Sequence, residues 1–235
     1  MSLYIVGVGG TTRPGSSTEK AIAVALKAAA AEGAETLLLG GSDLDLPLYA
    51  PERPDRTDRA ARLVREIARA DGMLVASPGY HGTVSGLVKN ALDYVEDLRD
   101  DARPYLDGRA VGCIAVAYGW QAAVTTLGTL RTITHALRGW PTPLGVALNV
   151  SAPTFDADGA PLDERTRAQV RQAIDDGLVR LGVEPSERQL LEFLAQRLHA
   201  HATGQRRIDV ERLLRHSLLL FGRARCQGAH VVQTI

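Results

Sequence analysis

The chain of 235 residues predicts an α/β fold, a five-stranded parallel sheet with helices on both faces. The main observation is that short apolar runs alternate with longer helical patterns. Each predicted strand is followed by a helix, an order that joins parallel strands by right-handed crossovers. The expected strands are Leu3–Val8, Glu35–Leu39, Gly72–Ser77, Ala110–Ala117 and Leu144–Val150. The expected helices are Thr18–Glu32, Arg56–Ala70, Ser85–Arg99, Ala122–Arg138 and Leu162–Leu181.

The residue types support these elements in order along the chain. Leu3–Val8 is rich in β-branched and aromatic residues, which favour strands. Glu19–Ala31, which follows, has the Ala, Leu and Lys content of a helix. Gly72–Ser77 begins with a short apolar run typical of a buried strand, and the run from Gly112 is almost continuously apolar, as a central strand should be. One face of the helix between them carries Leu87, Ala91, Leu92 and Val95.

Composition limits the partners that we expect. With 27 Lys and Arg against 27 Asp and Glu, the formal net charge is zero, which does not favour nucleic acid or an anionic membrane. Cys113 and Cys226 form neither a disulfide framework nor a metal site, and the six histidines lack ligand spacing. No charged segment precedes an apolar core at the N-terminus, and no apolar stretch approaches a membrane span. We therefore expect a cytoplasmic protein with no metal, nucleic acid or membrane partner.

A loop rich in glycine and hydroxyl residues, Gly9–Thr18, connects the first strand to the first helix. Backbone N–H groups at a helix N-terminus attract anions, and Arg13 can add bidentate hydrogen bonds. The loop is not a Walker A motif, and it lacks the third glycine of Gly-x-Gly-x-x-Gly. Its hydroxyl groups favour a terminal phosphate monoester over a pyrophosphate. The alternative is a Ser/Thr helix cap that binds no ligand.

A second loop, Ser77–Thr83, lies at the junction of the third strand with the next helix. In an open parallel sheet, ligands bind at this edge. Pro78 removes one backbone donor and stiffens the turn, while Gly79 and Gly82 allow the backbone to approach a flat group closely. The loop therefore favours a planar, hydrogen-bonding ligand.

These segments resemble the NADPH-dependent FMN reductase family. Gly10–Thr18 is similar to the family's phosphate loop. Pro78–Thr83, followed by Gly86–Asp93, is similar to its flavin-ring signature, usually Pro-Glu-Tyr-Asn-Gly-Ser and then Gly-x-x-Lys-Asn-Ala-x-Asp. Asp45–Tyr49 resembles the family's loop after the second strand. The resemblance covers Leu3–Leu181.

The resemblance implies a flavodoxin-like fold that binds FMN, with NADPH or NADH as the hydride donor. Reduced FMN would then reduce a small acceptor (a quinone, an azo or nitro compound, free flavin or a pathway intermediate) by a ping-pong cycle. Because the flavin carries this chemistry, no catalytic side chain is expected. The alternative is a flavodoxin-like electron carrier or a non-catalytic flavin-binding module, although such carriers are usually strongly acidic. The expected cofactor-binding residues are Thr11, Arg13, Ser16, Ser17, Thr18, Pro78, Gly79, Tyr80, His81, Gly82, Thr83, Tyr118, Gly119 and Trp120.

Three places depart from the family pattern. Gly79 stands where relatives often have Glu, and His81 stands where they often have Asn. We expect His81 to act mainly through its backbone, with its side chain as a modulator. Relatives usually have a glycine-rich turn at the position of Tyr118–Trp120. These aromatic rings either stack over the flavin or anchor the loop against a helix or a second subunit. Lys89, Asn90 and Asp93 are expected to tie their helix to a loop or to a partner subunit.

The C-terminal region has no counterpart in the resemblance. We divide the chain into an FMN-binding domain, residues 1–184, and a helical extension, residues 185–235. Ser186–Gln189 has capping-box spacing at the start of one helix, and a second is expected over Asp209–Phe221. The apolar rows of such a helical hairpin must be covered. We expect it to form the interface of a homodimer or homotetramer, or an active-site lid.

Overall fold

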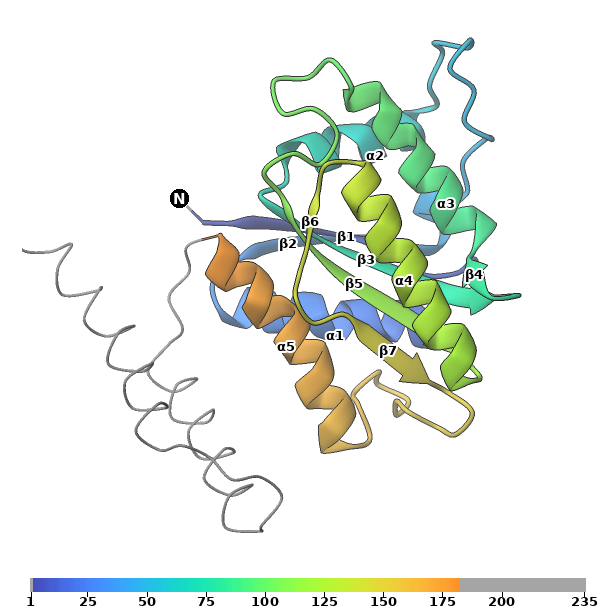
Figure 1. Cartoon of the computed structure of the whole chain (residues 1–235), viewed down its shortest axis with the longest axis vertical. Helices are drawn as coiled ribbons and strands as arrows, with labels where there is room; N and C mark the ends of the chain where they lie inside the picture. Colours follow the sequence, from blue (N-terminus) through green and yellow to red (C-terminus); the bar gives the residue numbers. More distant parts are fainter. Residues whose placement is uncertain (1, 182–235) are drawn as a thin grey trace, which may run out of the picture. The chain divides into compact units, whose positions relative to one another are not determined.

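A computed structural model describes residues 2–181, so the predicted extension, residues 185–235, lies outside the described residues. A parallel sheet in the order β2-β1-β3-β5 runs through the molecule, and β6 and β7 both pair with β5 (Figure 1). The strands are β1 (Tyr4–Gly9), β2 (Glu35–Leu39), β3 (Gly72–Tyr80), β4 (Thr83–Val84), β5 (Ala110–Ala117), β6 (Trp140–Pro141) and β7 (Val146–Asn149). The α-helices are α1 (Ser17–Ala31), α2 (Asp58–Arg69), α3 (Gly86–Asp93), α4 (Trp120–Ala136) and α5 (Glu164–Arg180), and the 3₁₀ helices are η1 (Gly41–Leu44) and η2 (Tyr94–Leu98).

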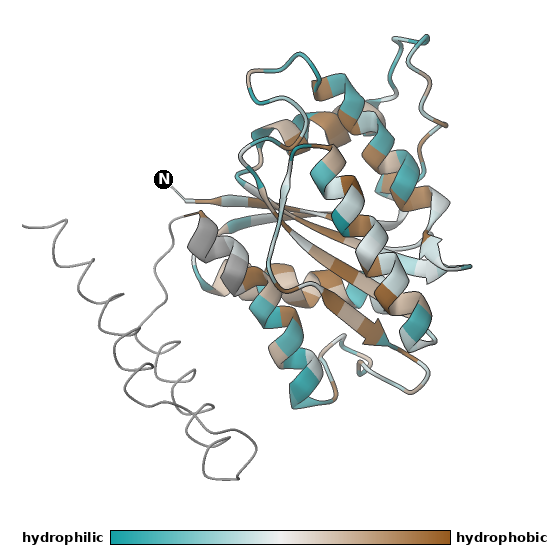
Figure 2. Ribbon diagram, in the orientation of Figure 1, coloured by the Kyte–Doolittle hydropathy of each residue, from teal (hydrophilic) through white to brown (hydrophobic). Residues whose placement is uncertain are grey.

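Two apolar clusters, one on each face of the sheet, hold the layers together. On one face α1 and α5 contribute residues such as Ile22 and Ile174. On the other face α2, α3 and α4 contribute Leu63, Val88 and Leu130. In Figure 2 the brown, apolar residues gather on the strands and on the helix sides that face them. Helices cover both faces, as strands with near-continuous apolar sequences require, and the predicted α/β fold is confirmed.

The last predicted strand, Leu144–Val150, is shorter in the structure, and a further short strand precedes it. Its main part is β7, while β6 pairs with the beginning of β5 and precedes the predicted start. Pro143 lies between β6 and β7 and has no N–H group to donate to the ladder. With β6 and the antiparallel β4, the sheet contains seven strands within residues 2–181, whereas five were predicted.

Two further boundaries differ from the prediction near the carboxyl edge of the sheet. β3 continues past Ser77 to Tyr80 and turns back into the antiparallel β4. The fourth long helix begins at Trp120 rather than at Ala122. Both differences shorten the loops that the sequence predicted at this edge.

A buried arginine, Arg109, closes the opposite end of the sheet. Its side chain is 0% exposed and donates hydrogen bonds to the carbonyls of Ala68 (2.6 Å) and Ala70 (3.1 Å), at the end of α2. It also donates to the carbonyl of Tyr105 at 3.1 Å. Burial, together with the nearby Arg103, lowers the pKa of Arg109 to about 10. The guanidinium is still charged at neutral pH, which suits its position at a helix C-terminus.

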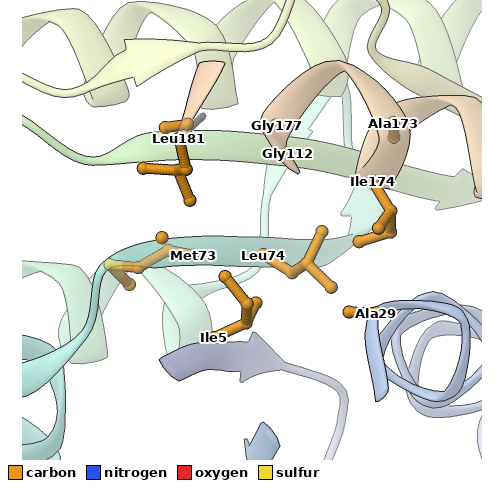
Figure 3. A pocket seen from close by; sticks show the side chains of 11 residues that line it. Ile5, Ala29, Met73, Leu74, Gly112, Ala173, Ile174, Gly177 and Leu181 are labelled. Carbon is orange, nitrogen blue, oxygen red and sulfur yellow. The ribbon is translucent and has the colours of Figure 1, made fainter. Parts of the chain in front are cut away.

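A small apolar cavity lies between the sheet and the helices α1 and α5 (Figure 3). Its volume is about 20 Å³, and side chains such as Ile5, Leu74, Ile174 and Leu181 line it. It borders Gly72, the first residue of β3, and therefore lies away from the carboxyl edge of the sheet. A cavity of this size and lining is a packing void between layers and has no polar partners for a ligand.

Replacement of Gly177 by Ala should stabilise the protein. A Cβ atom at Gly177 would meet only Thr142 Cγ2, at an ordinary 3.6 Å. Because glycine inside a helix costs roughly 0.5–1 kcal/mol relative to alanine, Gly177→Ala should raise the free energy of unfolding by about that amount in urea titrations. Gly112→Ala is the contrasting variant, since its Cβ would lie 2.6 Å from Leu74 Cδ2 in the core. A loss of stability in Gly177→Ala would contradict the described packing of α5.

Candidate functional site

The loop after β1 and the segment after β3 lie side by side because their strands pair directly. The parallel register runs from Ile5 beside Gly72 to Gly9 beside Ala76. Both segments therefore leave the sheet at the same carboxyl edge, where the strand order reverses between β1 and β3. An open pocket of about 160 Å³ lies between them. Its lining residues are Gly10, Thr11, Thr12, Pro78, Tyr80, Ser85, Gly86 and Leu87.

Three of the predicted cofactor-binding residues, Thr11, Pro78 and Tyr80, line this pocket. The structure adds Gly10, Thr12, Ser85, Gly86 and Leu87, which the prediction did not include among the site residues. Ser85 is the N-cap of α3, and its Oγ accepts a hydrogen bond from the Val88 N–H at 3.2 Å. A Ser directly before an amphipathic helix is a sequence signal that could have identified this residue.

The loop between β1 and α1, residues 10–16, is called the α1 loop below. Together with the start of α1, it presents several hydrogen-bond donors. The N–H groups of Ser17 and Thr18 are the first of the helix, so they have no partner within it. The Arg13 side chain is exposed, and it makes no hydrogen bond or ion pair with any residue in the described range 2–181. Thr11 Oγ1 accepts a hydrogen bond from the Arg13 N–H at 3.2 Å, which folds the loop back on itself. A cation beside unpaired N–H groups has the donor chemistry of a phosphate site.

The hydroxyl residues of the α1 loop and of the start of α1 differ in their accessibility. Ser16 is buried and caps α1, because its Oγ accepts a hydrogen bond from the Glu19 N–H at 3.2 Å. Thr18 is also buried, whereas Ser17 is half-buried. The structure therefore places the Ser16 side chain in a capping role and leaves Thr11, Arg13 and Ser17 more accessible.

The segment after β3 is a tight hairpin built on the residues His81 and Gly82. Their φ angles are 51° and 87°, and Tyr80 pairs with Thr83 across the turn. Two successive positive φ angles define a type I′ turn, in which Asn and Gly are the favoured residues. The side chains of His81 and Thr83 are exposed, and the imidazole has no hydrogen-bond partner within residues 2–181. The hairpin thus presents His81 at its tip.

Ser77 fixes the base of this hairpin. Its buried Oγ accepts a hydrogen bond from the Ser85 N–H at 2.9 Å and donates to the Pro78 carbonyl at 2.9 Å. These bonds join the end of β3 to the start of α3 across the hairpin. These two hydrogen bonds hold this wall of the pocket in place.

Helix α4 explains why position 79 is a glycine in this chain. A Cβ atom at Gly79 would lie 2.7 Å from Thr126 Oγ1, 3.1 Å from Ala117 Cβ and 3.3 Å from the Ala122 carbonyl oxygen. The Thr126 hydroxyl is buried and has no hydrogen-bond partner among residues 2–181. The described packing leaves no room for the Glu side chain that relatives often carry at this position.

The aromatic residues Tyr118 and Trp120 lie at the same edge of the sheet but do not line the pocket. Gly119 is the N-cap of α4 and Trp120 is its first residue. Tyr118 is 78% exposed and Trp120 is 54% exposed, so neither is an anchor buried within its own subunit. Their contact with a flavin therefore stays a prediction, as it does for Gly79, His81, Gly82 and Thr83.

Asn90, from the predicted signature on α3, holds the loop after η1. Its Nδ2 donates to the carbonyls of Leu46 (3.3 Å) and Pro47 (2.9 Å), and its Oδ1 accepts from the Tyr49 N–H at 2.9 Å. Tyr94 also donates to the Pro47 carbonyl at 3.0 Å. Asn90 therefore ties its helix to a loop, one of the two roles expected of it. Lys89 pairs with Asp93 on the helix surface.

Arg56 and Asp97 fasten the far end of the same loop. Arg56 Nε and Nη2 donate to the two carboxylate oxygens of Asp97 at 2.7 and 2.8 Å. The Arg56 guanidinium lies 4.9 Å from the centre of the Tyr49 ring. Its hydrogen bonds lower the pKa of Asp97, so the pair stays ionised at neutral pH.

Two other kinds of feature are absent from the described residues. Within residues 2–181, no group of three or more His, Cys, Asp or Glu side chains is placed to hold a metal ion. The same range contains no helix long and apolar enough to cross a membrane. Tyr80 is the one titratable side chain among the residues that line the pocket.

The chain belongs to the NADPH-dependent FMN reductase family, whose model matches residues 3–152. It is 31% identical over 88 residues to an NADPH azoreductase from Bacillus sp. (strain OY1-2), covering 37% of this chain and 46% of that protein. It is 32% identical over 101 residues to an FMN-dependent NADPH-azoreductase from Staphylococcus haemolyticus (strain JCSC1435), covering 43% of this chain and 47% of that protein. The chain thus spans about half the length of these curated relatives.

Solved structures share the fold. The flavoenzyme NAD(P)H:(acceptor) oxidoreductase FerB from Paracoccus denitrificans superposes with a TM-score of 0.66 at 22% identity, covering 77% of this chain and 97% of that chain. The apo form of an NADH:FMN oxidoreductase superposes with a TM-score of 0.59 at 21% identity, covering 80% and 94%. The predicted flavodoxin-like architecture is therefore confirmed.

The close approach of α4 to the hairpin predicts the effect of Gly79→Ala. The added Cβ has no space against Thr126, so the free energy of unfolding should fall by about 1–3 kcal/mol. Adding Thr126→Ala removes the crowding hydroxyl and should restore part of this loss in a double-mutant cycle. Gly86→Ala is the matched control, because a Cβ there meets nothing within 4 Å. The described packing would be contradicted if Gly79→Ala cost no more than Gly86→Ala in urea titrations.

Proposed function

We propose that this pocket binds FMN and that the protein is an FMN-dependent NAD(P)H oxidoreductase. The observation that carries the proposal is that the loop with these donors, the Arg13 guanidinium and the first N–H groups of α1, leaves the sheet next to the β3–β4 hairpin at the switch point between β1 and β3. Membership of the NADPH-dependent FMN reductase family supports it. Both relatives described above are named NADPH azoreductases, which supports NADPH as the hydride donor.

At the α1 loop, we assign the FMN phosphate to Arg13 and the accessible backbone donors. Arg13 can form charge-assisted bonds with phosphate oxygens, and the dipole of α1 favours negative charge at this end. Thr11 in the loop and Ser17 at the start of α1 add hydroxyl groups. Ser16 supports the site indirectly by capping the helix. These donors therefore fit a phosphate monoester.

At the β3–β4 hairpin, we assign the flavin ring to the surface formed by Pro78, Tyr80 and Gly86. The exposed backbone at Gly82, at the tip of the hairpin, offers a hydrogen-bond donor to the polar edge of the ring. His81 lies at the hairpin tip and is a modulator of the bound ring in this proposal. When bound, FMN supplies the hydride chemistry between a nicotinamide and a small acceptor. The chain's own part is to hold the ring with one face open to both substrates in turn.

The acceptor in this proposal is a small planar compound, such as a quinone or an azo compound. The names of the azoreductase relatives support an azo compound. Tyr80, Tyr118 and Trp120 expose aromatic rings at the same edge of the sheet, and such rings stack favourably on planar acceptors. We extend the proposal to a cytoplasmic location and to a homodimer or homotetramer. The large apolar residues Trp120 and Val124, which α4 exposes, support the oligomer.

Arg13→Ala should weaken FMN binding by about 1.5–3 kcal/mol, the usual worth of a hydrogen bond to a charged group. Titration of flavin fluorescence measures this loss directly. Riboflavin, which lacks the phosphate, should bind far more weakly than FMN and should not distinguish the variant from the parent. Arg59→Ala is the matched control, because Arg59 is an exposed arginine on α2. Equal affinity of the parent protein for FMN and riboflavin would exclude a phosphate site in the α1 loop.

A further inference from the structure

An anion of the chain itself lies beside the α1 loop, the carboxylate of Glu19 in the first turn of α1. Glu19 Oε2 accepts a hydrogen bond from the Gly15 N–H at 3.1 Å. On the other side of the loop, a Cβ atom at Gly10 would lie 3.8 Å from Glu19 Cβ, so the side chain runs beside Gly10 as well. Gly10 lines the pocket. Glu19 therefore lies within the segment that supplies the free donors.

This carboxylate stabilises the loop when no ligand is bound. Glu19 is the acidic residue in the first turn of α1, where the helix dipole favours negative charge. Its N–H also donates to the capping Ser16 Oγ, so one residue closes both the helix start and the Gly15 turn. These contacts resemble a capping box displaced by one residue. The free protein thus satisfies one donor of the loop with an internal acid.

The same carboxylate opposes a second anion. A phosphate monoester carries up to two negative charges, and two like charges a few ångströms apart repel each other even where solvent screens them partly. A phosphate that uses the Gly15 N–H must also displace Glu19 from it. The helix start that attracts phosphate therefore contains a residue that weakens phosphate binding.

We propose that Glu19 sets the affinity of the site for FMN, weakening it so that the flavin exchanges with solution instead of remaining permanently bound. This inference rests on the proposed function, since it assumes that the α1 loop holds the FMN phosphate. It assigns to Glu19 a role opposite to that of Arg13 at the same site. The free protein is stabilised by Glu19, and the flavin complex is weakened by it.

Glu19→Gln tests this role, because glutamine keeps an oxygen for the Gly15 N–H and removes the charge. The dissociation constant of FMN should fall roughly tenfold, as expected when a unit charge near a dianion is removed at a partly exposed site. The dissociation constant of riboflavin should not change. The difference between parent and variant should shrink in about 1 M salt, where the Debye length is near 3 Å. The melting temperature of the flavin-free variant should fall slightly, whereas its rise on adding FMN should be larger than in the parent.

Glu35→Gln is the matched control, since it removes the same charge from an exposed residue at the amino end of β2. It should leave FMN affinity unchanged. If Glu19→Gln binds FMN no more tightly than the parent while Arg13→Ala still binds it more weakly, Glu19 does not set the affinity and the inference alone is overturned. If neither the parent nor Glu19→Gln binds FMN saturably, the proposed function is overturned and the inference with it.

Discussion

The direct pairing of β1 with β3 is the constraint on which the site depends. At the end of this pairing a Cβ atom at Gly9 would lie 2.2 Å from the Ala76 carbonyl oxygen, so a side chain cannot be accommodated there. This close approach brings the α1 loop and the β3–β4 hairpin to opposite walls of one pocket. Their helices, α1 and α3, then pack on opposite faces of the sheet. A single strand pair thus joins the loop to which we assign the FMN phosphate to the hairpin to which we assign the flavin ring.

Much of the fold could be predicted because its strands are short apolar runs whose boundaries coincide with changes in polarity. β2 and β5 have the predicted bounds, and β1 and β3 have the predicted cores. The short strand β6 was not predicted, because it has only two residues, Trp140 and Pro141, and lies outside the apolar run that predicted β7. The buried Arg109 was also missed, since sequence patterns treat a charged residue as exposed, and its partners are carbonyls from the end of another helix.

The candidate site, like the fold, could be predicted in part. The α1 loop and the hairpin were identified from their glycine, proline and hydroxyl residues, and the structure brings Thr11, Pro78 and Tyr80 together. The roles of individual residues in these segments could not be predicted, because the spacing of residues in the sequence does not give backbone conformation or contacts between segments. The left-handed conformation of His81, the contact between Gly79 and Thr126, and the hydrogen bond from Gly15 to Glu19 each depend on the folded backbone. The predicted extension, residues 185–235, lies outside the described residues.

Hydrogen–deuterium exchange with and without FMN tests the central claim most directly, because it reports on the backbone donors of both walls at once. The account predicts slower exchange on adding FMN at the N–H groups of residues 11–18 and 79–84, with little change along α2. Riboflavin should protect the second segment more than the first, since it lacks the phosphate. Protection confined to one of the two segments, or located away from both, would contradict a single FMN site between β1 and β3.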